Sequence, residues 1–244
     1  MNRLLVSLVA VLTPALAFAQ LNFPGGNVPA GTTWGVPGLS QTVTLNGDVT
    51  IPAGVTLTIL PGTTITAAAT DNIMRAGGTN LVDLFVEGSL VVQEMAGQES
   101  TFTGPTSGAA SWGGFIVSAG ATVQAGSTRF QRMSQGLRAT SATLTLNNVT
   151  FSTSTACLSV AGTGTTTTIA GSTFAGCATP ALTVSGSTVN VSSSIIRDTT
   201  NTTAAVNVSA GTVTIDRSTL AYNAGIGVLS SCGSTGSISV TNSI

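Results

Sequence analysis

The sequence predicts an all-β fold in which coils of about 22 residues stack into a parallel β-helix, a solenoid with one continuous apolar core. Two observations support this prediction: a bulky residue recurs at a nearly constant spacing, and apolar residues alternate with Thr and Ser around it. Thr and Val favour strands because branching at Cβ restricts rotation about χ1. Long stripes with a 3.6-residue period, which would indicate helices, are nearly absent.

The repeat is anchored on a bulky residue that follows the inward-facing residue of a short strand by five positions. The bulky residues lie 21, 23, 22 and 24 positions apart, and they are Phe130, Phe151, Phe174, Ile196 and Leu220. The strand residues before them are Ala125, Leu146, Ile169, Val191 and Ile215. Because one coil cannot bury its own apolar face, we expect coils to stack about 4.8 Å apart. Each of the two sets should then form a column inside the solenoid.

The first 46 residues are expected to precede the regular coils. Residues 1–19 are predicted to be a signal peptide, since Arg3 precedes an apolar stretch that ends in the small-x-small pattern of Ala17 to Ala19. The alternative is an uncleaved anchor helix, which the short apolar stretch disfavours. Cleavage after export would leave the protein secreted, extracellular or on the cell surface. Residues 20–46, with Trp34 and several Pro and Gly, are expected to form an N-terminal cap.

The β-helix itself is predicted to span residues 47–244. Its first strands lie in the alternating segment from Gly47 to Ile65, and residues 67–83 and 103–112 are expected to be loops or insertions. The sequence ends at Ile244, one position before the next expected bulky residue. The last coil is therefore expected to be incomplete, which favours a truncated chain or a dimer through this end.

Charged residues are few, and the two signs nearly balance. The sequence has seven Arg as its basic residues, eight acidic residues and no His; without residues 1–19, six Arg face eight acids, a net charge of −2. This charge argues against binding to nucleic acid or electrostatic docking to a membrane. Arg129, Arg132 and Arg138 form one basic cluster, for which solvated positions are favoured over an anionic glycan site. No later apolar run approaches the roughly 20 residues of a membrane span.

Several motifs carry a resemblance to a known family. They are GDVTIPAGVTLTILPGTTI (residues 47–65), LFVEGSLVVQ (residues 84–93), SWGGFIV (residues 111–117) and LTLNNVTF (residues 144–151). In this order they resemble the bacterial extracellular right-handed parallel β-helix repeat proteins of the pectin-lyase-like fold. The resemblance covers nearly all of residues 40–244 and implies a right-handed solenoid. It implies no single function, since this fold is found in lyases, hydrolases, adhesins and proteins of no known activity.

The resemblance also directs attention to Asp and Arg residues. Pectate lyases of this fold use Arg as a base beside acidic calcium ligands, and related hydrolases use carboxylates that lie within about 5–10 Å of each other. The candidates here are Asp198, Asp216 and Arg197. Asp198 lies two positions after its bulky residue and Asp216 lies four before, which places the two at different corners of the coil. Surface Arg–Asp pairs, or Asp residues that cap turns, are therefore the favoured interpretation.

No cofactor or metal site is expected. The sequence has no His, and its Cys, Asp and Glu residues lack the spacing of a zinc or iron site. Asp71 and Asp83 bracket an insertion and could bind calcium there, but solvated loop charges are the favoured interpretation. Cys157 and Cys177 lie 20 positions apart, close to the length of one coil. They could form a disulfide after export or remain two buried thiols.

Thr and Ser recur in a pattern that predicts a polar outer surface. The pairs fall on successive coils, at Thr143-x-Thr145, Thr166-x-Thr168, Thr212-x-Thr214 and Ser237-x-Ser239. They are expected to stack on the outer face of a sheet as a flat ladder of hydroxyl groups, which the segment Thr188 to Asn190 interrupts. Flat Thr arrays are the surface that ice-binding β-helices use. The simpler interpretation is that exposed strand positions favour Thr.

These patterns favour a secreted or cell-surface protein with a structural, adhesion or glycan-binding role and without a catalytic site. Its expected partner is a polysaccharide or another surface protein, because sheet faces rich in Thr and Ser can form hydrogen bonds with either. One alternative is a polysaccharide lyase or glycoside hydrolase, which would need Asp198, Asp216 and Arg197 to converge in a groove. The other alternative is an ice- or surface-binding protein that uses the Thr-rich face.

Overall fold

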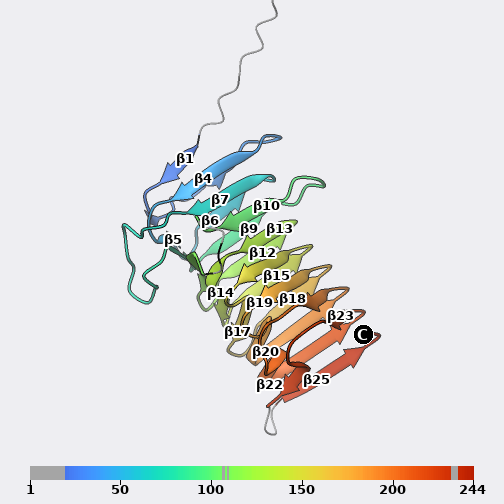
Figure 1. Cartoon of the computed structure of the whole chain (residues 1–244). Coiled ribbons are helices and arrows are strands. Elements are labelled where there is room, and N and C mark those ends of the chain that lie inside the picture. Colours follow the sequence, from blue (N-terminus) through green and yellow to red (C-terminus); the bar gives the residue numbers. More distant parts are fainter. Residues whose placement is uncertain (1–19, 106–107, 109, 232–235) are drawn as a thin grey trace, which may run out of the picture.

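The protein is an all-β rod of stacked coils, as predicted (Figure 1). The computed structural model describes residues 20–105, 108, 110–231 and 236–244, so the predicted signal peptide, residues 1–19, lies outside the described part. All regular elements in the described part are β-strands, and the sheets are built from parallel strand pairs. The described part also contains no helix that is long and apolar enough to cross a membrane.

Each coil contributes strands to two parallel sheets, which enclose the core from three sides. Sheet A has nine strands in the order β1 (Leu21–Phe23), β4 (Gln41–Leu45), β7 (Thr63–Ala67), β10 (Ser100–Thr103), β13 (Thr128–Gln131), β16 (Thr150–Ser154), β19 (Thr173–Cys177), β21 (Ile195–Arg197) and β23 (Thr219–Ala221). Sheet B has sixteen strands in two legs, which β20 (Leu182–Ser192) and β22 (Ala204–Asp216) join because they are long enough to run through both.

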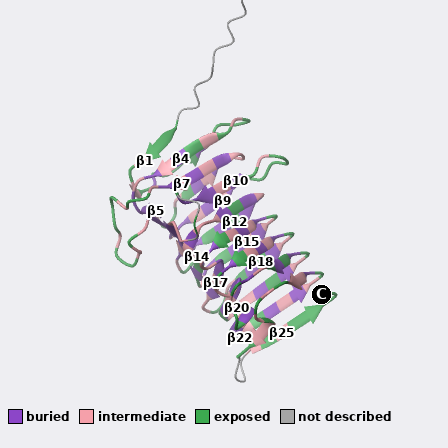
Figure 2. Ribbon diagram, in the orientation of Figure 1, coloured by how far each residue is buried: buried purple, intermediate pink, exposed green. Residues whose placement is uncertain are grey.

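The two legs of sheet B contain the remaining strands. The first leg has β2 (Gly26–Asn27), β5 (Val49–Ile51), β8 (Asp83–Val86), β11 (Trp112–Val117), β14 (Met133–Thr140), β17 (Leu158–Ala161) and β24 (Ile226–Ser230). The second leg has β3 (Thr33–Trp34), β6 (Thr56–Ile59), β9 (Ser89–Val92), β12 (Thr122–Gly126), β15 (Thr143–Asn147), β18 (Thr166–Ala170) and β25 (Gly236–Thr241). Along most of these strands buried and more exposed side chains alternate, as the bands of burial in Figure 2 show, whereas β5 and β8 are buried at every position.

Both predicted columns are present in the core. In sheet A the register places Phe130 on Phe151, Phe151 on Phe174, Phe174 on Ile196 and Ile196 on Leu220. The rings of Phe151 and Phe174 are stacked with centroids 4.8 Å apart. The second column runs in register through Ala125, Leu146, Ile169, Val191 and Ile215. The nearly constant spacing in the sequence therefore corresponds to one turn of the solenoid, as expected.

Residues 20–46, the predicted cap, take the form of a further coil. The strands β1, β2 and β3 pair in parallel with β4, β5 and β6. Trp34 is 2% exposed and lies in register with Ile59, so it belongs to the same core. β2 and β3 have only two residues each. Strands this short leave no alternating pattern, which explains why the sequence alone did not indicate a coil here.

The corner between the second leg of sheet B and sheet A is built in the same way on successive coils. One residue of this corner has a left-handed backbone on each coil, and these residues are Ser127, Asn148, Gly171, Ser193, Arg217 and Asn242. The residues that follow four of them form a hydroxyl series, which we call the serine ladder: Ser172, Ser194, Ser218 and Ser243. Ser194 Oγ accepts the Ser172 N–H at 3.1 Å and donates to the Ser192 carbonyl at 2.8 Å. The serine ladder thus pairs backbone groups that the corner removes from the sheets.

Candidate functional site

The outer surface of the second leg of sheet B carries a column of hydroxyl groups along the solenoid. The column contains Thr56, Ser89, Thr122, Thr143, Thr166, Thr188, Thr212 and Ser237. Paired strands lie about 4.8 Å apart, so the hydroxyl groups repeat at this spacing. Some of them bond to one another: Thr122 Oγ1 donates to Ser89 Oγ at 2.8 Å. We call this surface the hydroxyl face.

The adjacent outer column, two positions further along each strand, is polar but mixed. It contains Val91, Gln124, Thr145, Thr168, Asn190, Thr214 and Ser239. The predicted interruption of the Thr array is wrong for Thr188, which pairs with Thr166 on one side and Thr212 on the other. Within the segment Thr188 to Asn190, the outward residue that departs from the Thr pattern is Asn190, in the second column. The register shifts between Val184 and Ser185 and again between Ser185 and Thr188, and the two shifts offset each other, so Thr188 is aligned with Thr212.

The outer surface of sheet A provides a comparison, because it is also rich in Thr. Its column contains Thr42, Thr64, Thr101, Arg129, Thr150, Thr173, Ile195 and Thr219. Arg129 and Ile195 interrupt this column, and the Arg129 guanidinium forms an ion pair with Glu99 at 2.9 Å. Strand propensity alone therefore produces a discontinuous Thr column, whereas the hydroxyl face is continuous.

A buried acidic group anchors the insertion between β7 and β8. The two carboxylate oxygens of Asp48 accept the backbone N–H groups of Asp83 and Arg75, each at 2.7 Å. Asp71 Oδ1 accepts the N–H groups of Asp48 at 3.1 Å and Ile73 at 3.0 Å. Burial raises the pKa of Asp48 to about 6 although both backbone hydrogen bonds act to lower it, and burial also raises the pKa of Asp83. These carboxylates fix the backbone of the insertion.

A cavity of about 460 Å³ opens beside this anchor, and Arg75 forms part of its lining. The Arg75 guanidinium lies 4.4 Å from the centre of the Phe85 ring, donates to Thr50 Oγ1 at 3.1 Å and forms an ion pair with Glu87. Both oxygens of Asp48, which also lines the cavity, already accept backbone N–H groups. The charged groups of this cavity therefore hold the insertion against sheet B.

The segment Trp112-Gly113-Gly114 packs against the Asp83 carboxylate of the same anchor. A Cβ on Gly113 would lie 1.9 Å from Asp83 Oδ1, and a Cβ on Gly114 would lie 2.3 Å from the carbonyl oxygen of Gly136. Trp112 Nε1 donates to the Gln131 carbonyl at 2.8 Å. The two glycines are required by close backbone and carboxylate contacts, so this motif is structural.

The structure brings Arg197 together with Asp198 but places Asp216 elsewhere on the coil. Asp216 ends β22, before the corner that leads into sheet A, whereas Asp198 follows β21, at the other end of the sheet A strands. The Asp198 N–H donates to the Ala221 carbonyl there. Arg197 forms an ion pair with Asp198, and Arg217 forms one with Asp216 at 3.4 Å. Each carboxylate is thus paired with its neighbour in the sequence, as in the favoured surface-pair interpretation.

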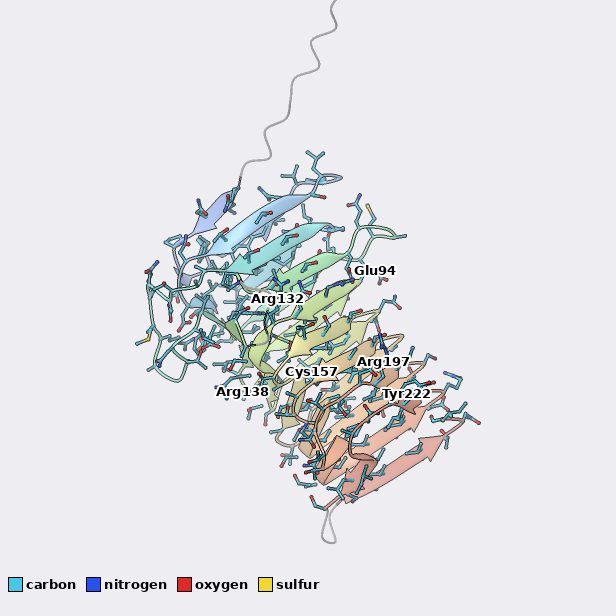
Figure 3. The ribbon with its side chains drawn as sticks, in the orientation of Figure 1. Glu94, Arg132, Arg138, Cys157, Arg197 and Tyr222 are labelled. Carbon is cyan, nitrogen blue, oxygen red and sulfur yellow. A yellow bond between two sulfur atoms is a disulfide. The ribbon has the colours of Figure 1, made fainter. Side chains whose placement is uncertain are left out.

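The three Arg residues that are close in the sequence lie on separate sides of the coil. Arg129 belongs to sheet A, Arg132 lies at the following corner, and Arg138 belongs to the first leg of sheet B. Arg132 donates to the Gly104 carbonyl at 3.3 Å. Arg138 lies at the edge of the solenoid opposite to Glu94 (Figure 3). These side chains therefore form no single basic surface.

The candidate cysteines lie on adjacent coils inside the core. Cys157 and Cys177 form a disulfide with an Sγ–Sγ distance of 2.02 Å, and both residues are fully buried. Among the described residues, no group of three or more His, Cys, Asp or Glu side chains is arranged to hold a metal ion. Asp71 and Asp83, the residues weighed as calcium ligands, accept the backbone N–H groups of Asp48, Ile73 and Thr79.

Comparison with known proteins bears on the family of this chain. The family model for the right-handed β-helix region matches residues 94–244, which is more than half of the chain. No curated protein and no solved structure matches the chain. The matched region contains most coils of both sheets and most of the hydroxyl face. The chain therefore belongs to the family of right-handed β-helix proteins.

Proposed function

We propose that this protein is exported and binds a neutral polysaccharide along its hydroxyl face, without catalytic turnover. The observation that carries the proposal is the unbroken column of hydroxyl groups from Thr56 to Ser237. Each hydroxyl can donate one hydrogen bond and accept two, as can the hydroxyl groups of a sugar. A polymer that lies along the solenoid can therefore bond to successive coils.

The backbone geometry favours binding by many weak contacts. The β-branched Thr side chains are restricted at χ1 before a ligand arrives, so little side-chain entropy is lost on binding. A single exchanged hydrogen bond contributes only about 0.5–1.5 kcal/mol. Affinity then depends on several coils at once, which suits an extended polymer better than a small molecule. The hydroxyl column contains no charged residue, which suits a neutral polymer.

A set of Thr→Val substitutions tests this proposal, because Val keeps the shape and strand propensity of Thr but lacks the hydroxyl. The combined variant Thr143→Val, Thr166→Val, Thr188→Val and Thr212→Val should lose at least about tenfold in affinity for barley β-glucan, xylan or mannan, the equivalent of about 1.4 kcal/mol. Affinity electrophoresis on gels that contain each polymer measures the change.

The matched control carries four Thr→Val substitutions on the outer surface of sheet A, at Thr42, Thr64, Thr150 and Thr173. Circular dichroism and thermal unfolding verify that both variants keep the native fold. The control variant should bind as the native protein does. Equal losses in the two variants, or no binding of the native protein to any of these polymers, would contradict the proposal.

Binding to ice or another crystalline surface is the second candidate, because the hydroxyl groups of the face repeat at a fixed spacing. The mixed second column, which includes Val91, Gln124 and Asn190, makes this candidate weaker. Thermal hysteresis of the native protein that disappears in the variant of the hydroxyl face would favour it. The absence of thermal hysteresis together with polymer binding would leave the first proposal alone.

A further inference from the structure

A cavity of about 300 Å³ opens on the hydroxyl face where β9, β12 and β15 end. Its lining comes from three successive coils and includes Val91, Gln93, Glu94, Gln124, Gly126 and Asn147. The register aligns Val91 with Gln124, and Gly126 with Asn147. The cavity therefore lies across the coils, beside the hydroxyl column rather than at the end of the rod.

Gly126 determines how the Glu94 side chain lies in this cavity. A Cβ at this position would lie 2.7 Å from Glu94 Cβ and 2.8 Å from Glu94 Oε2. The missing side chain lets the Glu94 carboxylate lie over the end of β12. On the next coil the same position carries Asn147, whose side chain forms a wall of the cavity. The glycine at this position thus makes room for the Glu94 side chain beside β12.

The Glu94 carboxylate is held in place by residues of two coils. Its Oε1 accepts the Ser127 hydroxyl at 2.9 Å and the Asn148 side-chain amide at 2.8 Å. Ser127 and Asn148 occupy the left-handed corner positions of their coils, so their backbones are fixed by the fold. Within the described structure Oε2 receives no hydrogen bond, and it remains an acceptor in a fixed position.

The cavity also offers amide groups that the fold itself does not use. The side-chain amides of Gln93, Gln124 and Asn147 form no hydrogen bond with any other described residue. Each amide can donate two hydrogen bonds and accept two, and Val91 supplies a small apolar surface between them. A carboxylate, several amides and an apolar patch can together bind the hydroxyl groups and the C–H face of one sugar ring.

We propose that this cavity is the specificity subsite of the hydroxyl face and holds one residue of a neutral polysaccharide. The inference rests on the proposed function and adds the position at which one sugar residue of the polymer is recognised. Glu94 is the one charged residue of the lining, which therefore contains no cationic side chain. A uronate placed there would meet a like charge, so neutral sugars bind and polygalacturonate does not.

Short oligosaccharides separate this subsite from the rest of the hydroxyl face. Isothermal titration calorimetry with cellotetraose, xylotetraose, mannotetraose and tetragalacturonate measures binding to the native protein and to two cavity variants. For whichever neutral tetrasaccharide the native protein binds, Gln124→Ala should lower the affinity about tenfold. Glu94→Gln should lower it as well, and should also raise the affinity for tetragalacturonate, because the like charge is removed. A merely structural role of Glu94 would not produce this reversal.

The matched control is Asn22→Ala, which removes an exposed side-chain amide from sheet A, outside the hydroxyl face and its cavity. It should bind the tetrasaccharides as the native protein does. If the native protein binds a neutral polymer and the cavity variants bind it equally well, the subsite is wrong while the proposed function stands. If the native protein binds none of the polymers or tetrasaccharides, both fall. Native preference for tetragalacturonate would also overturn the subsite.

Discussion

At the scale of single residues, the buried polar groups of this protein serve mainly the backbone. Asp48 accepts two backbone N–H groups, one of them from Asp83, which lies 35 positions away in the sequence. Ser194 likewise connects the backbones of two coils. Buried groups that are bonded in this way are costly to alter, because substitution leaves a backbone donor or acceptor without a partner.

The raised pKa of Asp48 predicts how stability depends on pH. The folded protein holds the Asp48 proton more tightly than the unfolded chain, since burial raises the pKa from 3.8 to about 6. The free energy of unfolding should therefore fall as the pH rises from 3.8 to about 6 and then level off. Asp48→Asn should make the free energy of unfolding fall less steeply with pH. Urea unfolding between about pH 3.5 and 7, a range that includes both pKa values, measures this dependence.

The control for this experiment is Asp216→Asn, because the pKa of Asp216 is shifted in the opposite direction to that of Asp48. Hydrogen bonds from Asn242 and Thr241 lower its pKa, and the side chain is partly exposed to solvent. This variant should keep the decline in stability between pH 3.8 and 6. The role assigned to Asp48 would be refuted if Asp48→Asn retained the full native slope, with Asp83 then left as its source.

At the scale of elements, the corner between sheet B and sheet A depends on the serine ladder as much as on its left-handed residue. Each rung accepts an N–H from one coil and donates to a carbonyl of its own coil, as Ser218 does for Ser194 and Asp216. The corner can therefore turn sharply while its backbone groups stay paired. Neighbouring coils are connected at this corner in the same way that the sheets connect them along the sides.

Ser194→Ala tests the contribution of one rung. The substitution removes the acceptor of the Ser172 N–H in a fully enclosed position, so we expect a loss of about 1–3 kcal/mol in the free energy of unfolding. The control is Ser159→Ala, on the outer surface of β17, where the effect should stay within about 0.5 kcal/mol. Urea unfolding of both variants measures the difference; similar losses would show that the ladder adds nothing specific.

The predictable parts of this structure are those that repeat in the sequence. The regular recurrence of bulky residues from Phe130 to Leu220 predicts both the length of a coil and the column in the core, because equivalent positions of neighbouring coils lie on one another. The corners were not predictable: Arg132 and Tyr222 adopt a left-handed backbone although neither residue type favours it. Contacts such as Glu94 with Asn148, 54 positions apart, require the coils to be stacked before they exist.

At the scale of the whole molecule, the coils form one continuous unit with an internal covalent link. The core columns run through successive coils without a break, and the Cys157–Cys177 disulfide joins two of these coils. Such a molecule has no separate lobes within the described part, so both the hydroxyl face and its cavity belong to a stiff rod (Figure 1). Ligand contacts on one coil are therefore held at fixed distances from those on the next.

A rod whose turns stack the same core positions on one another can be shortened by a whole turn. A chain without residues 189–212 joins Thr188 directly to Val213, and Ser218 then takes the place of Ser194 beneath Ser172. This deletion should still give cooperative unfolding and a strand-type circular dichroism spectrum, whereas deletion of residues 189–198 alone, less than half a turn, should abolish both. Loss or duplication of a full turn would thus alter the reach of the protein in evolution and leave its interior unchanged.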